Sequence, residues 1–444
     1  MSAVVTSASA AAELAAIVGG AHVVDDPAAL AHYAIDDAAP AVAAAPGSEE
    51  EVAAVMRLAG AYGLVVVPAG GFTRQGIGYP PARADLLLDL TRLTATQHYD
   101  PGDLTIGVGA GTRLADLQAR LAIHQQFLPV DPGCPQRTTV GGMLAASAQG
   151  PLEHGYGGLR DFCIGVRFVT ADGKLGKGGG RVVKNVAGYD LMKLLIGSFG
   201  TLGVITSASF KLFHLPAATR TYMAEFAGLE EAITFRDRLL RSPLGPMCLE
   251  IANPRAAEYL GLDARPWRIL VRAAGSDAVL RRYRAELGQA TTREVEGEAE
   301  TKLWRAFSGF EESILARHQN AMVFAVSVPI AGVAAALAAA ERAALDYNFL
   351  CAVIGRAGVG SLRVAFLPIA VDPPSAMQYA NAASEFRGQL PEEQASAVVL
   401  RCPQEAKPHF SLWGTSPTDL EAMRMVKAAL DPGNLLNRGR FMVG

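Results

Sequence analysis

Glycines placed directly after an apolar run form the clearest candidate binding loop of the sequence. The stretch VVVPAGGFTRQGIG begins at Val65 and carries Thr73 and Arg74 among its glycines. Glycine lets the main chain approach a ligand closely and tolerates positive φ, so such loops bring backbone N–H groups to phosphates. The chain contains neither G-x-x-x-x-G-K-[ST] nor G-x-G-x-x-G, which disfavours a P-loop ATPase and removes the usual nicotinamide signature. The ligand of the loop therefore has to be identified from the segments that accompany it.

Hydrophobic periodicity indicates the elements that hold this loop. Strands are predicted at 64–68, 85–90, 104–111 and 162–173, the last ending in an Asp-Gly turn. Helices are predicted at 48–63, 112–125 and 139–150. The third helix begins with glycines and small residues, where larger side chains would block a ligand.

The glycine-rich character fades after Pro216, and the pattern changes to strand–helix–strand–strand–helix–strand. The strands are predicted at 322–328, 349–357, 361–368 and 396–402, and the helices at 330–346 and 374–388. This order suggests an open antiparallel sheet with helices on one face, a ferredoxin-like layer. An amphipathic helix followed by Asp-Pro-Gly is predicted within 418–441. The predicted fold class is α+β.

Composition limits the classes of partner. A chain of 444 residues, half of them hydrophobic and 19% charged, predicts a globular protein of two or three domains. A net charge of −3 gives no electrostatic reason to expect nucleic acid or an anionic membrane. The N-terminus has no basic region before Glu13, and the longest apolar stretch, 331–340, is too short to span a bilayer. We expect a cytoplasmic protein, membrane-associated only through a partner.

The cysteines do not form a ligand set for a metal cluster. The five residues are scattered and no C-x-x-C occurs; they are Cys134, Cys163, Cys248, Cys351 and Cys402. This spacing provides neither a cysteine-ligated iron–sulfur cluster nor a structural zinc site, and it fits a reducing compartment.

Four stretches occur in an order that resembles a known family. The loop 68–76 is followed by DPGCPQRTTVGGMLAASAQG (131–150), YGGLRD (156–161) and VVKNVAGYDLMKLLIGSFGTLGVIT (182–206). Together they resemble the FAD-binding domain of the vanillyl-alcohol oxidase and p-cresol methylhydroxylase flavoprotein family. The closing DPGNLLNRGR resembles that family's D-P-x-x-x-x-N-P-G-R, with Arg438 where proline is usual. The resemblance runs from about Ala28 to Gly444.

The resemblance implies FAD as cofactor and a set of residues around it. Loop 70–73 and the helix start at 139–147 are expected to present backbone N–H groups to the pyrophosphate, and Gly203, Val204 and Ile205 to meet the adenine end. The full expected set is Pro68, Gly70, Gly71, Phe72, Thr73, Arg74, Gly76, Pro132, Gly133, Cys134, Thr138, Val140, Gly141, Gly142, Ala145, Ser147, Gly150, Tyr156, Gly157, Arg160, Asp161, Lys184, Gly203, Val204, Ile205 and Asn437.

Several members of this set also have a purely structural interpretation. Cys134 is interpreted as a small packing residue, and Arg160 with Asp161 as an ion pair tying two strands, with a cofactor contact as the alternative. Some members of the family attach flavin through a histidine in the first loop. Phe72 occupies that region here and His154 matches no attachment motif, so non-covalent FAD is expected.

The branch of the family is indicated by residues 184–190, KNVAGYD, which resemble glycolate oxidase and its 2-hydroxy-acid dehydrogenase relatives. Active members of that branch carry H-x-G-D-G-N-L-H, whose histidines bind a metal. The matching stretch here places Arg356 and Arg363 at both histidine positions. Arginine remains protonated and cannot ligate a metal, so no metal is expected. The departure indicates the second, FAD-binding type of glycolate oxidase subunit.

Three hypotheses follow. In the first, the chain is a flavin-bearing subunit that works with a homologous flavoprotein carrying the metal-binding histidines and with an iron–sulfur subunit. In the second, it is a self-sufficient oxidoreductase whose catalytic residues Arg356 and Arg363 bind a carboxylate. In the third, its flavin is structural. In each, residues 1–216 form the FAD-binding domain, 217–405 the cap and 406–444 a segment returning to the first domain. Tyr379 and His409 are weak candidates for a base, and Trp304 and Trp413 are interpreted as core aromatics.

Overall fold

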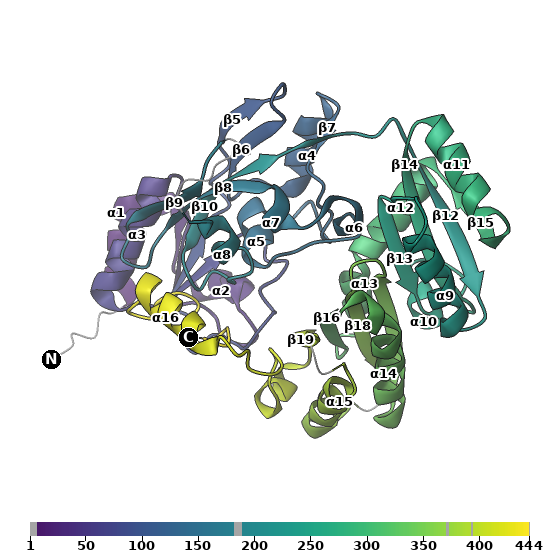
Figure 1. Ribbon diagram of the computed structural model, residues 1–444. Coiled ribbons are helices and arrows are strands. Elements are labelled where there is room, and N and C mark those ends of the chain that lie inside the picture. Colours follow the sequence, from purple (N-terminus) through teal and green to yellow (C-terminus); the bar gives the residue numbers. More distant parts are fainter. Residues whose placement is uncertain (1–6, 182–188, 370–372, 392–393, 444) are drawn as a thin grey trace.

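The computed structural model describes residues 7–181, 189–369, 373–391 and 394–443. Figure 1 shows residues 7–181 and 189–214, here called the N-terminal part, on the left and residues 218–369, 373–391 and 394–401, here called the cap, on the right. The C-terminal helix returns to the N-terminal part. The fold is α+β, as the sequence predicts.

A small sheet at the start of the N-terminal part holds the glycine loop. Its order is β1-β2-β4-β3, with β2, β3 and β4 parallel. Successive side chains of a strand point to opposite faces of the sheet. Val66, Leu86 and Leu88 pack with the neighbouring helices, whereas Ala69 and Leu87 face the opposite side. The elements are α1 (Ser7–Val18), β1 (Val23–Val24), α2 (Pro27–Leu30), β2 (Val42–Ala44), α3 (Glu49–Tyr62), β3 (Val66–Ala69) and β4 (Leu86–Asp89). The glycine loop therefore leaves a strand that is buried on both faces.

A five-stranded antiparallel sheet completes the N-terminal part, in the order β5-β6-β10-β8-β9. The hairpin between β8 and β9 turns at Gly173, whose φ of 76° suits the predicted Asp-Gly turn. The strands are β5 (Thr96–Asp100), β6 (Thr105–Gly109), β8 (Cys163–Val169), β9 (Leu175–Gly179) and β10 (Val204–Lys211). The helices are α4 (Leu114–Ala122), α5 (Val140–Ala145), α6 (Glu153–Tyr156), α7 (Leu159–Phe162) and α8 (Leu191–Leu195), and a two-stranded ribbon pairs β7 (Gln126–Phe127) with β11 (Phe213–His214).

The cap contains one sheet made of two similar units. The second unit, in the order β17-β18-β16-β19, has the ferredoxin-like connectivity that the sequence predicts. Its elements are β16 (Met322–Ser327), α14 (Val333–Asp346), β17 (Phe349–Arg356), β18 (Ser361–Pro368), α15 (Ala376–Gly388) and β19 (Ser396–Arg401).

The first unit of the cap repeats this connectivity, which the sequence analysis did not predict. Its order is β15-β12-β14-β13, and β13 pairs with β17 to join both units into eight strands. Its elements are β12 (Ala218–Phe226), α9 (Leu229–Leu240), β13 (Cys248–Ala252), α10 (Pro254–Ala257), β14 (Trp267–Gly275), α11 (Asp277–Leu287) and β15 (Thr291–Val295), followed by α12 (Gly297–Ser308) and α13 (Phe310–Arg317).

The two faces of the cap sheet differ. One face packs with α9, α11, α14 and α15 in the largest apolar cluster of the described residues. The other face packs with α12 and α13 and with Phe127 and Leu152 of the N-terminal part. This second face is therefore the one that meets the predicted cofactor domain.

The C-terminal segment lies against the N-terminal part through α16 (Leu420–Leu430), drawn in yellow in Figure 1. Lys427 donates to the carbonyl of Thr201 at 2.9 Å, and Leu436 bridges to Val66 of β3. No helix of the described residues is long and apolar enough to cross a membrane.

Candidate cofactor groove and adjoining cavity

A groove lies where the glycine loop, α5, the start of β10 and the C-terminal segment meet. Glycine and alanine provide much of its wall, so main chain is close to the space within it. The groove is lined by Pro68, Ala69, Gly70, Gly71, Phe72, Thr73, Arg74, Gln75, Leu90, Ala110, Thr139, Gly141, Gly142, Ala145, Ala146, Phe199, Gly200, Gly203, Ile205, Asn437 and Arg440.

The glycine loop presents unpaired donors to this groove. The backbone N–H groups of residues 70–74 donate to no acceptor within the described part of the chain. Phe72 has a φ of 57°, which reverses the chain locally and turns successive N–H groups inward. A Cβ on Gly71 would lie 1.6 Å from the carbonyl oxygen of Arg137, so glycine is required there. The loop is thus shaped to bind an anion through its main chain.

The C-terminal motif forms the opposite wall. The buried carboxylate of Asp431 accepts from Lys427 and from the backbone of Leu435 and Leu436, which fixes the turn after α16. Asn437 donates to the carbonyl of Phe199 at 2.6 Å, and its buried Oδ1 has no partner in the described structure. An unpaired buried oxygen at a groove indicates a missing hydrogen-bond donor.

Arg440 forms hydrogen bonds to the glycine loop. Its guanidinium donates to the carbonyl of Ile77 at 2.8 Å and to Oε1 of Gln75 at 2.7 Å. Burial lowers the pKa of Arg440 to about 10, so the side chain remains a cation at neutral pH. The closing arginine of the motif therefore holds the first loop in place.

These observations fit FAD. The unpaired N–H groups suit a pyrophosphate, the small residues allow a flat ring and ribityl chain to lie against main chain, and Asn437 offers an unused acceptor. FAD, when bound, supplies a two-electron acceptor.

About half of the predicted cofactor residues line the groove. They are Pro68, Gly70, Gly71, Phe72, Thr73, Arg74, Gly141, Gly142, Ala145, Gly203, Ile205 and Asn437. The sequence analysis did not include Thr139, Phe199, Gly200 or Arg440, although Arg440 belongs to the quoted C-terminal motif. Lys184 lies outside the described residues.

The other predicted cofactor residues are not part of the groove lining. Thr138 donates to the carbonyl of Gly133 at 2.9 Å, and Tyr156 packs edge-on against Phe127 and Phe213. Gly150 lines the second cavity described below. Apart from Arg160 and Asp161, the remaining described positions outside the groove lining are Gly76, Pro132, Gly133, Cys134, Val140, Ser147, Gly157 and Val204, the last with its side chain fully buried in the core behind β10.

One expectation is wrong. Arg160 and Asp161 do not form an ion pair between strands, because both lie on the short helix α7. Arg160 donates to the carbonyl of Ile196 at 3.0 Å, and Asp161 accepts from the backbone of Gly158 at 2.7 Å at the start of the helix. Both side chains therefore make local hydrogen bonds, and their contact with the cofactor stays a prediction.

A second cavity lies between the N-terminal part and the cap. Arg74 lines both this cavity and the groove, so the two spaces adjoin. The cavity is lined by Arg74, Gln149, Gly150, Pro151, Glu250, Phe307, Ser308, Phe310, Glu311, Ile354, Gly355, Arg356, Ser361 and Arg363.

Strand register brings the polar side chains of this cavity together. Glu250 on β13 pairs with Arg356 on β17, and Arg356 pairs with Ser361 at the start of β18. Arg363 lies two residues beyond Ser361, and directly paired residues and residues two apart share a face. Both predicted arginines, together with Glu250, therefore project from the sheet face that meets the N-terminal part.

Most charges around the cavity are paired. Arg356 forms an ion pair with Glu153 of the N-terminal part, and Arg74 forms one with Glu311 of α13. Arg401 lies 3.3 Å from the same Glu311. Burial alone would raise the pKa of Glu311, but these arginines hold it below its usual range. Three guanidinium groups thus share two carboxylates: Glu311 of the cap pairs with Arg74 of the first loop, and Glu153 of α6 pairs with Arg356 of the cap.

Two ionisable side chains at the cavity form no ion pair within the described residues. Arg363 donates only to the carbonyl of Leu362 at 3.2 Å, and no carboxylate of the described residues lies within 4 Å of it. Burial and the neighbouring Arg356 and Arg74 lower its pKa to about 10. Glu250 is 2% exposed and its Oε1 has no partner, and burial raises its pKa to about 8. The cavity therefore holds an unpaired cation beside a carboxyl group.

The other residues considered for chemistry lie elsewhere. Tyr379 is buried among the helices on the opposite face of the sheet and donates to the carbonyl of Asn320, and His409 is exposed on the C-terminal segment. Trp304 and Trp413 are buried, as predicted. Within the described residues no group of three or more histidine, cysteine, aspartate or glutamate side chains could hold a metal ion.

Comparison with known proteins agrees with this geometry. Residues 40–178 match the FAD binding domain family, and residues 215–393 and 406–441 match the C-terminal domain of FAD linked oxidases. The chain is 25% identical to glycolate oxidase subunit GlcD of Bacillus subtilis over 410 residues, covering 88% of this chain and 86% of that protein. It is 41% identical to glycolate oxidase subunit GlcE of Escherichia coli over 138 residues, covering 31% of this chain and 39% of that protein.

A solved structure gives the same fold. The structure of p-cresol methylhydroxylase with substrate bound superimposes with a TM-score of 0.74 at 18% identity, covering 98% of this chain and 96% of that one. The fold that the resemblance implied is confirmed, and so is FAD as the cofactor.

Proposed function

The chain belongs to the FAD-linked oxidases, and we propose that it is the FAD-binding subunit of a multi-subunit 2-hydroxy-acid dehydrogenase of the glycolate oxidase type. One observation carries the proposal: the cofactor groove adjoins, through Arg74, a buried cavity with a free guanidinium at Arg363. A small carboxylate can pair with that guanidinium next to the cofactor. The matches to glycolate oxidase subunits support the assignment of substrate class.

Electrons must then leave this chain. Single-electron carriers such as iron–sulfur clusters need ligating cysteines, and the free cysteines here include Cys134 and Cys402, which do not cluster with other ligands in the described structure. We therefore place the next carrier in an iron–sulfur subunit. A homologous flavoprotein subunit with intact metal-binding histidines is the second proposed partner, because this chain has Arg356 and Arg363 at those positions.

Native co-purification tests the assembly. With this chain as bait, we expect both partners in the eluate, together with dye-linked oxidation of glycolate or D-lactate. A bait that elutes alone and still oxidises a 2-hydroxy acid contradicts the subunit assignment. We place the complex in the cytoplasm, with membrane association through a partner, and cell fractionation tests that placement.

A self-sufficient oxidoreductase is the second candidate. The observation that favours it is the same unpaired Arg363, since a chain with its own carboxylate site does not need a partner to bind substrate. Dye-linked turnover by the isolated chain separates the two: the subunit proposal predicts turnover only after the partners are added back, and the self-sufficient enzyme predicts it without them. If the flavin is structural, this chain's FAD stays oxidised both with and without the partners.

A further inference from the structure

Glu250 carries a buried carboxyl group at the cavity that forms no ion pair within the described residues. It lies on β13 directly opposite Arg356, yet the guanidinium of Arg356 pairs with Glu153 instead. None of the arginines of the described structure lies within 4 Å of the Glu250 carboxyl group, and its Oε1 has no hydrogen-bond partner. Leaving such an oxygen unsatisfied inside a protein is unfavourable. An unpaired group that lines a cavity is therefore a candidate for contact with a ligand.

Arg363 supplies the complementary position. It projects from the same sheet face as Glu250 and lines the same cavity, and no carboxylate of the described residues neutralises it. A ligand with one carboxylate can form an ion pair with this guanidinium. Arg74 and Arg356 already form ion pairs, so they are not free to bind a second carboxylate. The apolar walls, Phe307, Phe310 and Ile354, suit a short side chain.

We propose that Glu250 accepts the hydroxyl proton of a small 2-hydroxy monocarboxylic acid whose carboxylate pairs with Arg363. This inference rests on the proposed function. The substrate O–H bond breaks and its proton moves to the Glu250 carboxylate. The Cα–H bond breaks and its hydrogen leaves with both bonding electrons for FAD, while the carbon–oxygen bond becomes a carbonyl. The products are a 2-oxo acid, protonated Glu250 and FAD that has gained two electrons.

The ionisation of Glu250 then governs the rate. Burial raises its pKa to about 8; the carboxyl groups of Asp131 and Glu153 add to the rise, and the guanidinium groups of Arg356 and Arg363 oppose it. The carboxylate form that accepts a proton therefore increases as the pH rises through that value. A bound carboxylate brings further negative charge, which favours the protonated form. Ligand binding near pH 8 should therefore be accompanied by proton uptake.

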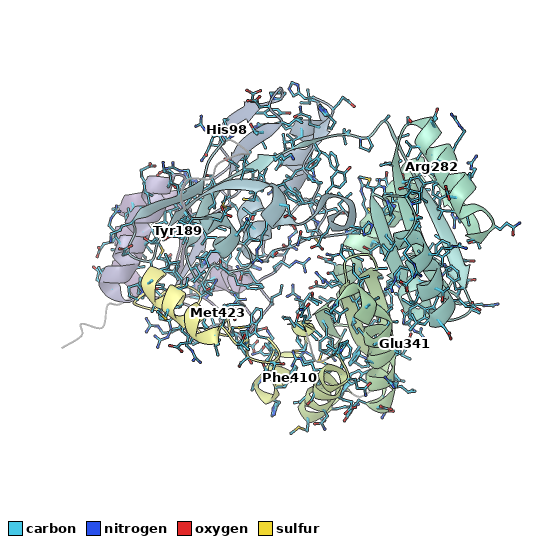
Figure 2. The ribbon with its side chains drawn as sticks, viewed as in Figure 1. His98, Tyr189, Arg282, Glu341, Phe410 and Met423 are labelled. Atoms are coloured by element: carbon cyan, nitrogen blue, oxygen red, sulfur yellow. The ribbon has the colours of Figure 1, made fainter. Side chains whose placement is uncertain are left out.

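The test compares Glu250→Gln with Glu341→Gln in the FAD-loaded protein. Glu341, labelled in Figure 2, lies on α14 on the opposite face of the sheet, and burial raises the pKa of its carboxyl group as well. 2-Hydroxyisobutyrate is the probe for binding, because it has the hydroxyl and carboxylate groups but no Cα–H bond to oxidise. Calorimetric titration in two buffers of different ionisation enthalpy measures the protons taken up.

We expect the wild-type protein and Glu341→Gln to take up a fraction of a proton near pH 8, and Glu250→Gln to take up none while binding the probe within about threefold. In the complex with its partners, reduction of this chain's flavin by glycolate should slow roughly 100- to 10,000-fold in Glu250→Gln, with loss of the rise around pH 8. Arg363→Met should weaken probe binding roughly 10- to 100-fold. If Glu250→Gln does not fold, Glu250→Asp should keep the proton uptake and lose at least about tenfold in rate, since its carboxyl group is withdrawn by one methylene.

Failure of the inference and failure of the proposed function give different results. If Glu250→Gln keeps both the proton uptake and a flavin reduction rate within threefold of wild type, Glu250 is not the proton acceptor. If wild-type flavin stays oxidised with every 2-hydroxy acid while the probe binds with proton uptake at Glu250, the proposed function is wrong but the ligand site remains.

Discussion

Replacement of Gly142 by aspartate should remove FAD without unfolding the protein. Gly142 is exposed to the groove in the first turn of α5, and a Cβ there would meet only Oγ1 of Thr139, at 3.1 Å. Its φ is not positive, so the main chain accepts other residues. Asparagine has nearly the same shape as aspartate and no charge, which makes Gly142→Asn the matched control.

The magnitude follows from Coulomb's law. A carboxylate about 5 Å from one pyrophosphate charge, at an effective dielectric constant of about 20, is repelled by about 3 kcal/mol, which weakens binding roughly 100- to 300-fold. The aspartate should leave the apoprotein as stable as the asparagine variant, because a negative charge near the start of a helix is not unfavourable.

The assay is fluorescence titration of each apoprotein with FAD, with thermal unfolding of the same samples as the check on folding. We expect Gly142→Asn to bind FAD measurably and Gly142→Asp to bind it at least 100-fold more weakly than Gly142→Asn. Equal affinities for the two variants, within about threefold, would show that no phosphate lies near α5 and would refute the assignment of the groove.

Three further predictions concern the cofactor, the metal and the pH dependence of stability. Because Phe72 takes the place of an attaching histidine, precipitation with trichloroacetic acid should leave yellow supernatant and a colourless pellet; flavin in the pellet would contradict non-covalent binding. Elemental analysis of the separately purified, dialysed chain should find no stoichiometric zinc, iron or manganese, and one metal per chain would overturn the alignment of Arg356 and Arg363 with the metal histidines. Because the pKa of Glu250 rises from an ordinary 4.5 to about 8 on folding, the folded state loses stability as the pH rises between these values. Glu250→Gln should therefore unfold at a higher temperature than wild type at pH 8 and at an equal temperature below pH 4.5, and a lower temperature at pH 8 would contradict the burial of an uncompensated carboxyl group.

The local elements could be predicted because their signals are local. Strand β18 has the predicted bounds, 361–368, since apolar residues fill it from Leu362 to Leu367 with Arg363 as the one interruption. Helix α3 begins after the predicted serine cap. The first unit of the cap was not predicted as such, although it repeats the connectivity of the second one. Nearly half of the residues in its helices α9 and α11 are charged, and the sequence shows no repeat with a fixed period.

The candidate site could be predicted only in part, because its pairings join distant residues. The ion pair of Arg356 with Glu153 spans 203 positions and that of Arg74 with Glu311 spans 237. No local pattern shows which of the two predicted arginines is neutralised and which is left for a ligand. Glu250 could have been noticed as an acidic residue inside the apolar strand 248–252. Its position opposite Arg356, however, depends on the register of that strand with β17.

Anaerobic mixing of the purified complex with glycolate or D-lactate tests the central claim, that this chain's own FAD receives electrons from a 2-hydroxy acid held beside Arg363. The measured quantity is the flavin bleached per complex in stopped-flow absorbance, compared between complexes that carry wild-type chain and those that carry Arg363→Met. We predict that wild-type complex bleaches this chain's flavin in addition to any partner flavin, and that Arg363→Met loses that contribution at low substrate concentration. Identical bleaching in the two complexes, with this chain's FAD remaining oxidised throughout turnover, would contradict the claim.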